Sequence, residues 1–324
     1  MLQQCNMADI VTGMQVEGFY LLREIVTKTS ANGSFYWDII LGDKTGQAIA
    51  KMWNIDPAAE GYTKNTLVKI RGKASEWRGK LQIRIDKMRE VSAEDELDLS
   101  DFVPVAPEDS AVMYGRIFAA AQSVGDEELQ SILVALLQEN KERLLYYPAA
   151  QSMHHSVRGG LLFHVDSMLK AAQALLVVYP FLNRDLLISG VIVHDIGKLD
   201  EMNSTVLGLV DEYTKDGILL GHIQLGIAQL EVLGQRLGIP REKVMLLQHM
   251  ILSHHYEPEF GSPKLPMFAE AEMLHYLDVM DARMYDFEAA LSEIEPGAFT
   301  ARVRHLERRL YKPELEPKNE ADGQ

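Results

Sequence analysis

The hydrophobic period of this chain changes once, across residues 91–110, and this change limits the folds open to it. Before this segment, apolar and polar residues alternate in short runs, most clearly over 80–88. After it, apolar residues recur at spacings of three and four, the period of a helix. A run of strands followed by a run of helices predicts two separate domains, and 324 residues suffice for both.

Residues 1–92 are predicted to form a small all-β barrel. Turn residues separate five segments that are rich in β-branched and aromatic residues. These segments are 18–29, 34–41, 47–53, 66–73 and 80–88, with a loop around residue 77. Acidic residues punctuated by Pro104 and Pro107 then predict a linker over 93–110.

Residues 111–311 are predicted to form an all-α helical bundle. The expected helices are 131–145, 160–178, 186–194, 217–237, 241–254, 266–290 and 299–311. The segment 160–178 is amphipathic and stops before Pro180, whereas 186–194 is apolar almost throughout and reads as a buried helix. The last residues, 312–324, contain two prolines and several acids and are predicted to be disordered.

Composition excludes several classes of protein. Hydrophobic residues at 47% and charged residues at 24% are typical of a soluble globular chain, so we expect no collagen-like or disordered protein. Neither a membrane-spanning run of about 20 apolar residues nor a secretory signal is recognisable, which predicts a cytoplasmic protein without a membrane partner. The single cysteine, Cys5, excludes an intramolecular disulfide and a cysteine-based zinc site.

Charge is distributed unevenly along the chain. The net charge is −15, but residues 1–100 hold 13 Lys and Arg against 14 Asp and Glu, whereas 101–324 hold 19 against 33. Within 64–89, nine basic residues face only Glu76 and Asp86. This local surplus suits contact with a phosphate backbone, with a solvated strand face as the alternative interpretation.

All ten histidines lie in the predicted helical part, and several share an arrangement with aspartates. One histidine or His-Asp pair falls on each of several successive predicted helices. The set consists of His164, His194, Asp195, His222, His254, His255 and Asp278. Helices of a bundle can each direct one such ligand to a shared interior. Any one of these histidines alone could instead be a core or helix-end residue with ordinary hydrogen bonds.

Imidazole and carboxylate groups without thiolates are typical of a catalytic divalent metal rather than a structural zinc. His164, His194, Asp195 and Asp278 suffice for one ion. His222, His254 and His255 would supply a second ion, with Asp195 as a bridging ligand. Two such ions clamp the attacking and leaving oxygens of a phosphoester. Asp281, one helical turn after Asp278, competes for the last ligand position.

The segment His194-Asp195-Ile196-Gly197-Lys198 resembles the signature of the HD-domain metal-dependent phosphohydrolases. With the preceding barrel, which resembles an OB-fold, and with the motifs at 159–164 and 221–223, the chain is similar to the YhaM family of 3′–5′ exoribonucleases. The resemblance covers residues 10–310. It implies hydrolysis of single-stranded RNA, with single-stranded DNA as a further substrate, from the 3′ end. It also implies two divalent ions. Mn²⁺ is the preferred metal, with Fe²⁺, Co²⁺, Zn²⁺ and Mg²⁺ as alternatives.

Roles follow for individual residues. Asp195 is the expected catalytic carboxylate, and Lys198 could place its ammonium on a phosphate oxygen. Candidate substrate contacts in the helical part are His154, His155 and Arg158, which precede a glycine pair. On the barrel the candidates are Trp53, Trp77, Arg78, Lys80 and Arg84, because OB-folds stack bases on aromatic rings and run phosphates over cations. Trp77 is the preferred aromatic residue.

Two other functions fit the same residues. The HD domain could hydrolyse a nucleotide or cyclic dinucleotide, although such an enzyme would not need the barrel. Alternatively, the chain could be a non-catalytic nucleic-acid-binding factor, although such a factor would have no reason to keep seven costly polar groups inside. The amphipathic late helices are compatible with a homo-oligomer.

Overall fold

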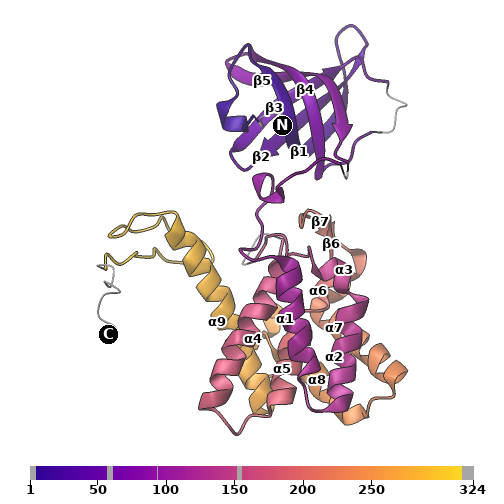
Figure 1. Cartoon of the computed structure of the whole chain (residues 1–324), viewed down its shortest axis with the longest axis vertical. Coiled ribbons are helices and arrows are strands. Elements are labelled where there is room, and N and C mark those ends of the chain that lie inside the picture. Colours follow the sequence, from indigo (N-terminus) through magenta and orange to yellow (C-terminus); the bar gives the residue numbers. More distant parts are fainter. Residues whose placement is uncertain (1–4, 57–60, 93, 152–154, 316–324) are drawn as a thin grey trace.

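The computed structural model describes residues 5–56, 61–92, 94–151 and 155–315. It has two parts stacked end to end, a β-barrel that contains the N-terminus and a helical bundle (Figure 1). The expected order of an all-β domain followed by an all-α domain is confirmed.

The barrel closes in the strand order β1-β2-β3-β5-β4. Its strands are β1 (Gln15–Thr29), β2 (Phe35–Asp43), β3 (Gly46–Trp53), β4 (Thr66–Trp77) and β5 (Lys80–Glu90), after a short 3-10 helix, η1 (Met7–Asp9). Strands β3 and β5 pair in parallel and the other neighbours are antiparallel. A small five-stranded barrel of this order is an OB-fold. Apolar residues such as Tyr20, Ile39, Ile70 and Ile83 fill its interior.

The hairpin between β4 and β5 is tighter than expected. Trp77, which we placed in a loop, is the last residue of β4, and β5 begins at Lys80. The two residues between them, Arg78 and Gly79, have φ values of 53° and 76°. Positive φ at both central residues is the requirement of a type I′ hairpin turn, which matches the twist of the strands.

The bundle packs around α5, whose residues from Leu186 to Val193 are all buried. Its helices are α1 (Ser110–Gln122), α2 (Glu127–Glu139), α3 (Lys141–Leu144), α4 (Gly160–Val178), α5 (Arg184–Val193), α6 (Lys198–Glu201), α7 (Lys215–Leu237), α8 (Arg241–Ser253) and α9 (Ala269–Ser292), with the 3-10 helices η2 (Leu99–Asp101) and η3 (Pro258–Phe260). By length and composition alone, α4 and α7 could cross a membrane, but both pack within the bundle.

Three expectations for the helical part were wrong. Helix α1 was not foreseen, and the expected helix 131–145 starts at Glu127 and breaks at Asn140. The segment 299–311 is not a helix, because Phe299 pairs with Tyr311 across a hairpin. The hairpin continues into the expected tail, where Lys312 N–H donates to Ala298 C=O at 3.0 Å. Of that tail, 316–324 lie outside the described residues.

Within the expected linker 93–110, residues 102 and 103 form a packed joint between the two domains. Phe102 and Val103 are buried against Leu21 and Leu67 of the barrel and against Leu207. Leu207 lies between two short strands that the sequence analysis missed, β6 (Met202–Ser204) and β7 (Val210–Tyr213). This β6–β7 hairpin directly connects α6 to α7, so the barrel rests on the segment between two elements of the predicted site (Figure 1).

Candidate metal centre

The buried end of α5 brings the His-Asp pair into the middle of the bundle. His194 and Asp195 follow Val193 directly and are buried. The next turn passes so close to α7 that a Cβ on Gly197 would lie 2.0 Å from the carbonyl oxygen of His222. Glycine at this position therefore lets the backbone of the His-Asp turn approach His222.

Four predicted ligands from three helices meet at the first cluster. The Nε2 atom of His164 on α4 lies 3.3 Å from Nε2 of His194 and 3.2 Å from Oδ1 of Asp278 on α9. The Oδ2 atom of Asp195 lies 3.4 Å from His194 Nε2 and 3.9 Å from His164 Nε2. Side chains more than 110 residues apart in the sequence thus present nitrogen and oxygen atoms to one small volume.

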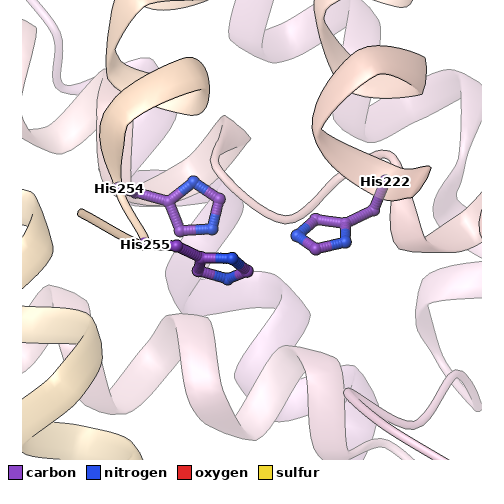
Figure 2. A group of neighbouring side chains, drawn as sticks. All are labelled: His222, His254 and His255. Carbon is purple, nitrogen blue, oxygen red and sulfur yellow. The ribbon is translucent and has the colours of Figure 1, made fainter. Parts of the chain in front are cut away.

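The other three predicted histidines form a second cluster beside the first. His254 and His255 directly follow α8, and His222 reaches them from α7, so the three rings face one another (Figure 2). One ring nitrogen from each lies within 4.8 Å of the others. Oδ1 of Asp195 lies 3.7 Å from His222 Nε2 and 3.9 Å from His254 Nε2. Asp195 therefore touches both clusters, one with each carboxylate oxygen.

Hydrogen bonds on the outer side orient four of these imidazoles. Nδ1 of His194 lies 2.9 Å from the carbonyl oxygen of Val191, and Nδ1 of His254 lies 2.7 Å from that of Ile251. A carbonyl oxygen only accepts, so Nδ1 carries the proton in both rings and Nε2 keeps its lone pair toward the site.

In His164 and His222, a carboxylate rather than a carbonyl oxygen orients the imidazole through Nδ1. Asp281 Oδ2 lies 2.7 Å from His164 Nδ1, and Glu201 Oε1 lies 3.3 Å from His222 Nδ1 and 3.0 Å from its backbone nitrogen. Sequence reasoning missed Glu201 and weighed Asp281 as a competing ligand. The structure places Asp281 behind His164 and Asp278 in front of it.

Unsatisfied polar atoms test whether the cluster suits a cation. Asp195 Oδ1, His222 Nε2 and His254 Nε2 are buried, and none has a hydrogen-bond partner among the described residues. Such atoms are costly in a protein interior unless another group satisfies them. A divalent cation would satisfy all three at once, so the donor set fits a metal.

The electrostatics of His254 and Asp195 agree with this donor set. Burial, reinforced by His255 and His194, lowers the pKa of His254 well below its ordinary value, so its imidazole is neutral, as a ligand must be. Burial opposes ionisation of Asp195, but the charges of Lys198 and His194 outweigh it and lower its pKa. His164 differs, because hydrogen bonds to Asp278 and Asp281 outweigh burial and raise its pKa to about 9, so its imidazole must lose a proton to bind a cation.

Comparisons with known proteins agree with this geometry. The HD domain family model matches residues 161–283, the span that contains all seven predicted ligands. A 3′–5′ exoribonuclease YhaM of Geobacillus sp. (strain WCH70) is 40% identical over 303 residues, 93% of each chain. The chain belongs to the YhaM family. A second member, from Shouchella clausii (strain KSM-K16), is 38% identical over 94% of this chain and 96% of that protein.

The barrel also has solved counterparts. The second OB-fold domain of replication protein A from Methanococcus maripaludis matches 30% of this chain and 100% of its own, with 15% identity and a TM-score of 0.24. The assignment of the barrel as an OB-fold rests on its own strand order rather than on this likeness.

Lys198 lies at the centre rather than at the surface. Its Nζ is 2.7 Å from Asp195 Oδ2, and 12% of its side chain is exposed. Asp195 raises the pKa of Lys198 against the effect of burial, so the ammonium stays charged beside the two clusters.

The structure describes two of the three predicted substrate contacts before α4. His155 is buried, with 1% of its surface exposed, and its Nε2 lies 2.9 Å from Asp281 Oδ2, so it supports the His164 side of the site. Arg158 donates from Nε to Val206 C=O at 3.1 Å and belongs to the joint. His154 lies outside the described residues.

The predicted barrel contacts fall at two places. Trp53 stacks on Tyr36 with ring centroids 4.4 Å apart, and the Lys51 ammonium lies 5.0 Å from the Tyr36 centroid. Trp77, 61% exposed, lies at the tip of the β4–β5 hairpin, and the Arg78 guanidinium lies over its ring. Lys80 pairs with Trp77 across that hairpin, whereas Arg84 lies further along β5 and contacts Asp86 at 3.3 Å.

Proposed function

We propose that this protein is a metal-dependent exoribonuclease that hydrolyses single-stranded RNA from the 3′ end. It uses two divalent ions, for which Mn²⁺ is the preferred candidate. The observation that carries the proposal is the position of Asp195 between two histidine clusters. Its Oδ1 atom and the Nε2 atoms of His222 and His254 are buried without hydrogen-bond partners among the described residues. Family membership supports the same reaction, because the relatives are named 3′–5′ exoribonucleases.

The two clusters define which residues would hold the ions. His164, His194 and Asp278 would hold one ion, His222, His254 and His255 the other, and Asp195 would contact both. A divalent cation supplies Lewis-acid polarisation of a phosphoryl oxygen and lowers the pKa of water at its open positions. The absence of thiolates in the set favours Mn²⁺, Fe²⁺ or Co²⁺ over a structural zinc.

The remaining residues prepare this centre for a phosphodiester. Asp281, Glu201 and two backbone carbonyls fix the imidazole orientations, so the ligands need no rearrangement. Lys198 keeps a positive charge beside Asp195 at 2.7 Å. A phosphate group that approaches Asp195 therefore meets a cation in an environment with little water, where its attraction is strengthened.

The barrel supplies surfaces for an unpaired strand. The Tyr36–Trp53 stack with Lys51 lies on the outer side of β2 and β3, and Trp77 with Arg78 lies at the hairpin tip. Base stacking on such rings contributes about 1–3 kcal/mol per base and does not depend on sequence. A single strand offers its bases for this contact, whereas a duplex does not, which is why we propose a single-stranded substrate.

Full-length protein and a 5′-labelled single-stranded RNA test the proposal. With Mn²⁺ we expect a ladder that shortens from the 3′ end, and chelator should stop it. A circular RNA of the same sequence should stay intact because it has no 3′ end. Asp195→Asn should lose cleavage while RNA binding persists. Cleavage of a cyclic dinucleotide with no change in the linear RNA would overturn the proposal in favour of a small-molecule phosphohydrolase.

A further inference from the structure

Three successive rows on the outer face of β4 and β5 pair a cation with a cation. The pairs are Lys69 with Arg89, Arg71 with Lys87, and Lys73 with Arg84. We call these six residues the cation ladder. Ile70, Ala74 and Ile83, which are each adjacent to a ladder residue, belong to the barrel core, so the ladder side chains share the opposite, outer face.

The ladder is electrostatically unfavourable on its own. Like charges directly opposite one another destabilise an antiparallel pair, and here three consecutive rows repeat the arrangement. Asp95 holds Arg89 with two hydrogen bonds of 2.7 and 2.8 Å, and Asp86 contacts Arg84 at 3.3 Å. The other four ladder cations form no ion pair within 4.0 Å with any described residue. Four of the six ladder cations therefore lack an anion within this distance, although Glu17 on β1 lies opposite Arg71.

The ladder also has a definite shape. Lys69, Arg71, Lys87 and Arg89 line a cavity of about 340 Å³ on the barrel surface, together with Glu17, Ile70 and Met88. A β-bulge next to Arg71 bends this part of the sheet. Rows on one face of a strand repeat every two residues, about 6.8 Å. The three cations on β4 thus form a line with a regular step, whereas on β5 the bulge places Lys87 and Arg84 three residues apart.

We propose that the cation ladder binds the phosphodiester backbone of the single-stranded RNA, an inference that rests on the proposed function. A linear polyanion with regularly spaced charges matches a line of unpaired cations, whereas an acidic protein surface has no such repeat. Residues 101–324, which include the helical part, hold 33 acidic against 19 basic residues, so this part of the chain repels the substrate. Retention of the strand therefore falls to the barrel.

The position of the ladder fits a strand that leads toward the helical part. Its first row lies two residues along β4 from Leu67, which packs against Phe102 and Leu207 in the joint between the domains. The ladder is separate from the Tyr36–Trp53 stack, which lies on β2 and β3. Backbone phosphates and stacked bases would thus be held by different faces of the barrel.

The test measures RNA binding by the chelated full-length protein, so that cleavage does not interfere. Fluorescence anisotropy with a labelled 30-nucleotide RNA is recorded over a series of salt concentrations. For a single strand, a plot of the logarithm of the binding constant against the logarithm of salt concentration has a negative slope of about 0.7 per phosphate contact. Arg71→Gln with Lys87→Gln should therefore reduce the slope by about 1.4 and weaken binding about 25-fold at 0.1 M salt.

Three controls make the result specific. Arg71→Lys with Lys87→Arg keeps both charges and should retain the wild-type slope. Arg236→Gln with Arg241→Gln removes two charges at exposed surface ion pairs of the helical part and should leave the slope unchanged. Lys73→Gln with Arg84→Gln repeats the test at the neighbouring row, should the first pair of substitutions impair folding.

The outcomes separate the ladder from the proposed function. An unchanged salt slope in both ladder variants would refute RNA binding by the ladder, even if the wild-type protein shortens RNA from the 3′ end. An equal loss of slope in the Arg236 and Arg241 variant would also refute the ladder, as would a change in oligomeric mass without a change in RNA binding. The ladder variants could show a reduced salt slope while the wild-type protein with Mn²⁺ leaves RNA intact. This result would support RNA binding by the ladder and refute the exoribonuclease activity.

Discussion

Asp281→Asn tests whether a carboxylate behind His164 sets the affinity of the metal centre. Asp281 Oδ2 contacts His164 Nδ1 at 2.7 Å and His155 Nε2 at 2.9 Å, while the opposite nitrogen of His164 faces Asp278 and His194. The asparagine keeps the size of the side chain but removes its charge. The substitution therefore affects the metal indirectly, by changing the charge beside the His164 ring.

The magnitude follows from that contact. A hydrogen bond to a charged group contributes about 1.5–3 kcal/mol, and loss of such an outer partner of a metal ligand typically weakens metal affinity about 10–100-fold. We expect this loss for one of the two ions, equivalent to about 1.4–2.8 kcal/mol. His155→Gln should cost less, because a glutamine amide can still donate to Asp281.

Isothermal titration of Mn²⁺ into the metal-free full-length protein measures both affinity and the number of ions bound. Asp286→Asn is the matched control, because Asp286 lies on the same helix and contacts His305 at 3.1 Å, away from the predicted ligands. Unchanged affinity in Asp281→Asn would refute a positioning role. Complete loss of one ion from the stoichiometry would instead make Asp281 a direct ligand.

Three further predictions concern single contacts. Glu201→Gln should weaken the ion held by His222 about 10-fold in the same titration, because the charge behind that imidazole is lost. Gly197→Ala should lower the free energy of unfolding in urea by about 1–3 kcal/mol, because its Cβ would lie 2.0 Å from the His222 carbonyl oxygen. Burial disfavours ionisation of Asp166, but hydrogen bonds from Arg116 outweigh it and lower its pKa. Its stabilising effect is therefore complete above about pH 4 and is lost as pH falls through the lowered pKa. Asp166→Asn should destabilise the protein by about 1.5–3 kcal/mol at pH 7 and remove this acid dependence of urea unfolding.

The domain order could be predicted because each half has a strong hydrophobic period. The failures have local causes. Helix α1 buries Ala120 and Ala121, and alanines weaken the contrast between its two faces. The segment 299–311 has apolar residues at helical spacing, yet only Leu310 and Thr300 are buried there. With no apolar face packed against the bundle, that spacing does not produce a helix.

The seven predicted ligands come together because polar groups inside apolar helices are costly unless they share a partner. Their supporting residues could not be found in the same way. Glu201 is one of many acids in the chain, and His155 follows no periodic pattern. Each acquires its partner only through tertiary contact, Glu201 across the close approach of α6 and α7, and His155 through α9.

The joint between the domains raises the question of whether they unfold together. Leu207, between β6 and β7, is buried against Leu21, Leu67 and Phe102, and a Leu to Ala change at a buried site typically costs about 2–5 kcal/mol. The stabilisation that is lost belongs to the contact between barrel and bundle rather than to the core of either domain. Leu207→Ala should therefore split one calorimetric transition into two, with the barrel melting first.

Leu219→Ala is the matched control, because Leu219 on α7 is 68% exposed and should leave the transition unchanged. The hairpin that carries Leu207 continues directly into α6 and α7, which hold Glu201 and His222. If the barrel and bundle are coupled through it, Leu207→Ala should also weaken Mn²⁺ binding at His222 without any change in the ligands. A single unshifted transition would show that the contact contributes little and that the domains are coupled elsewhere.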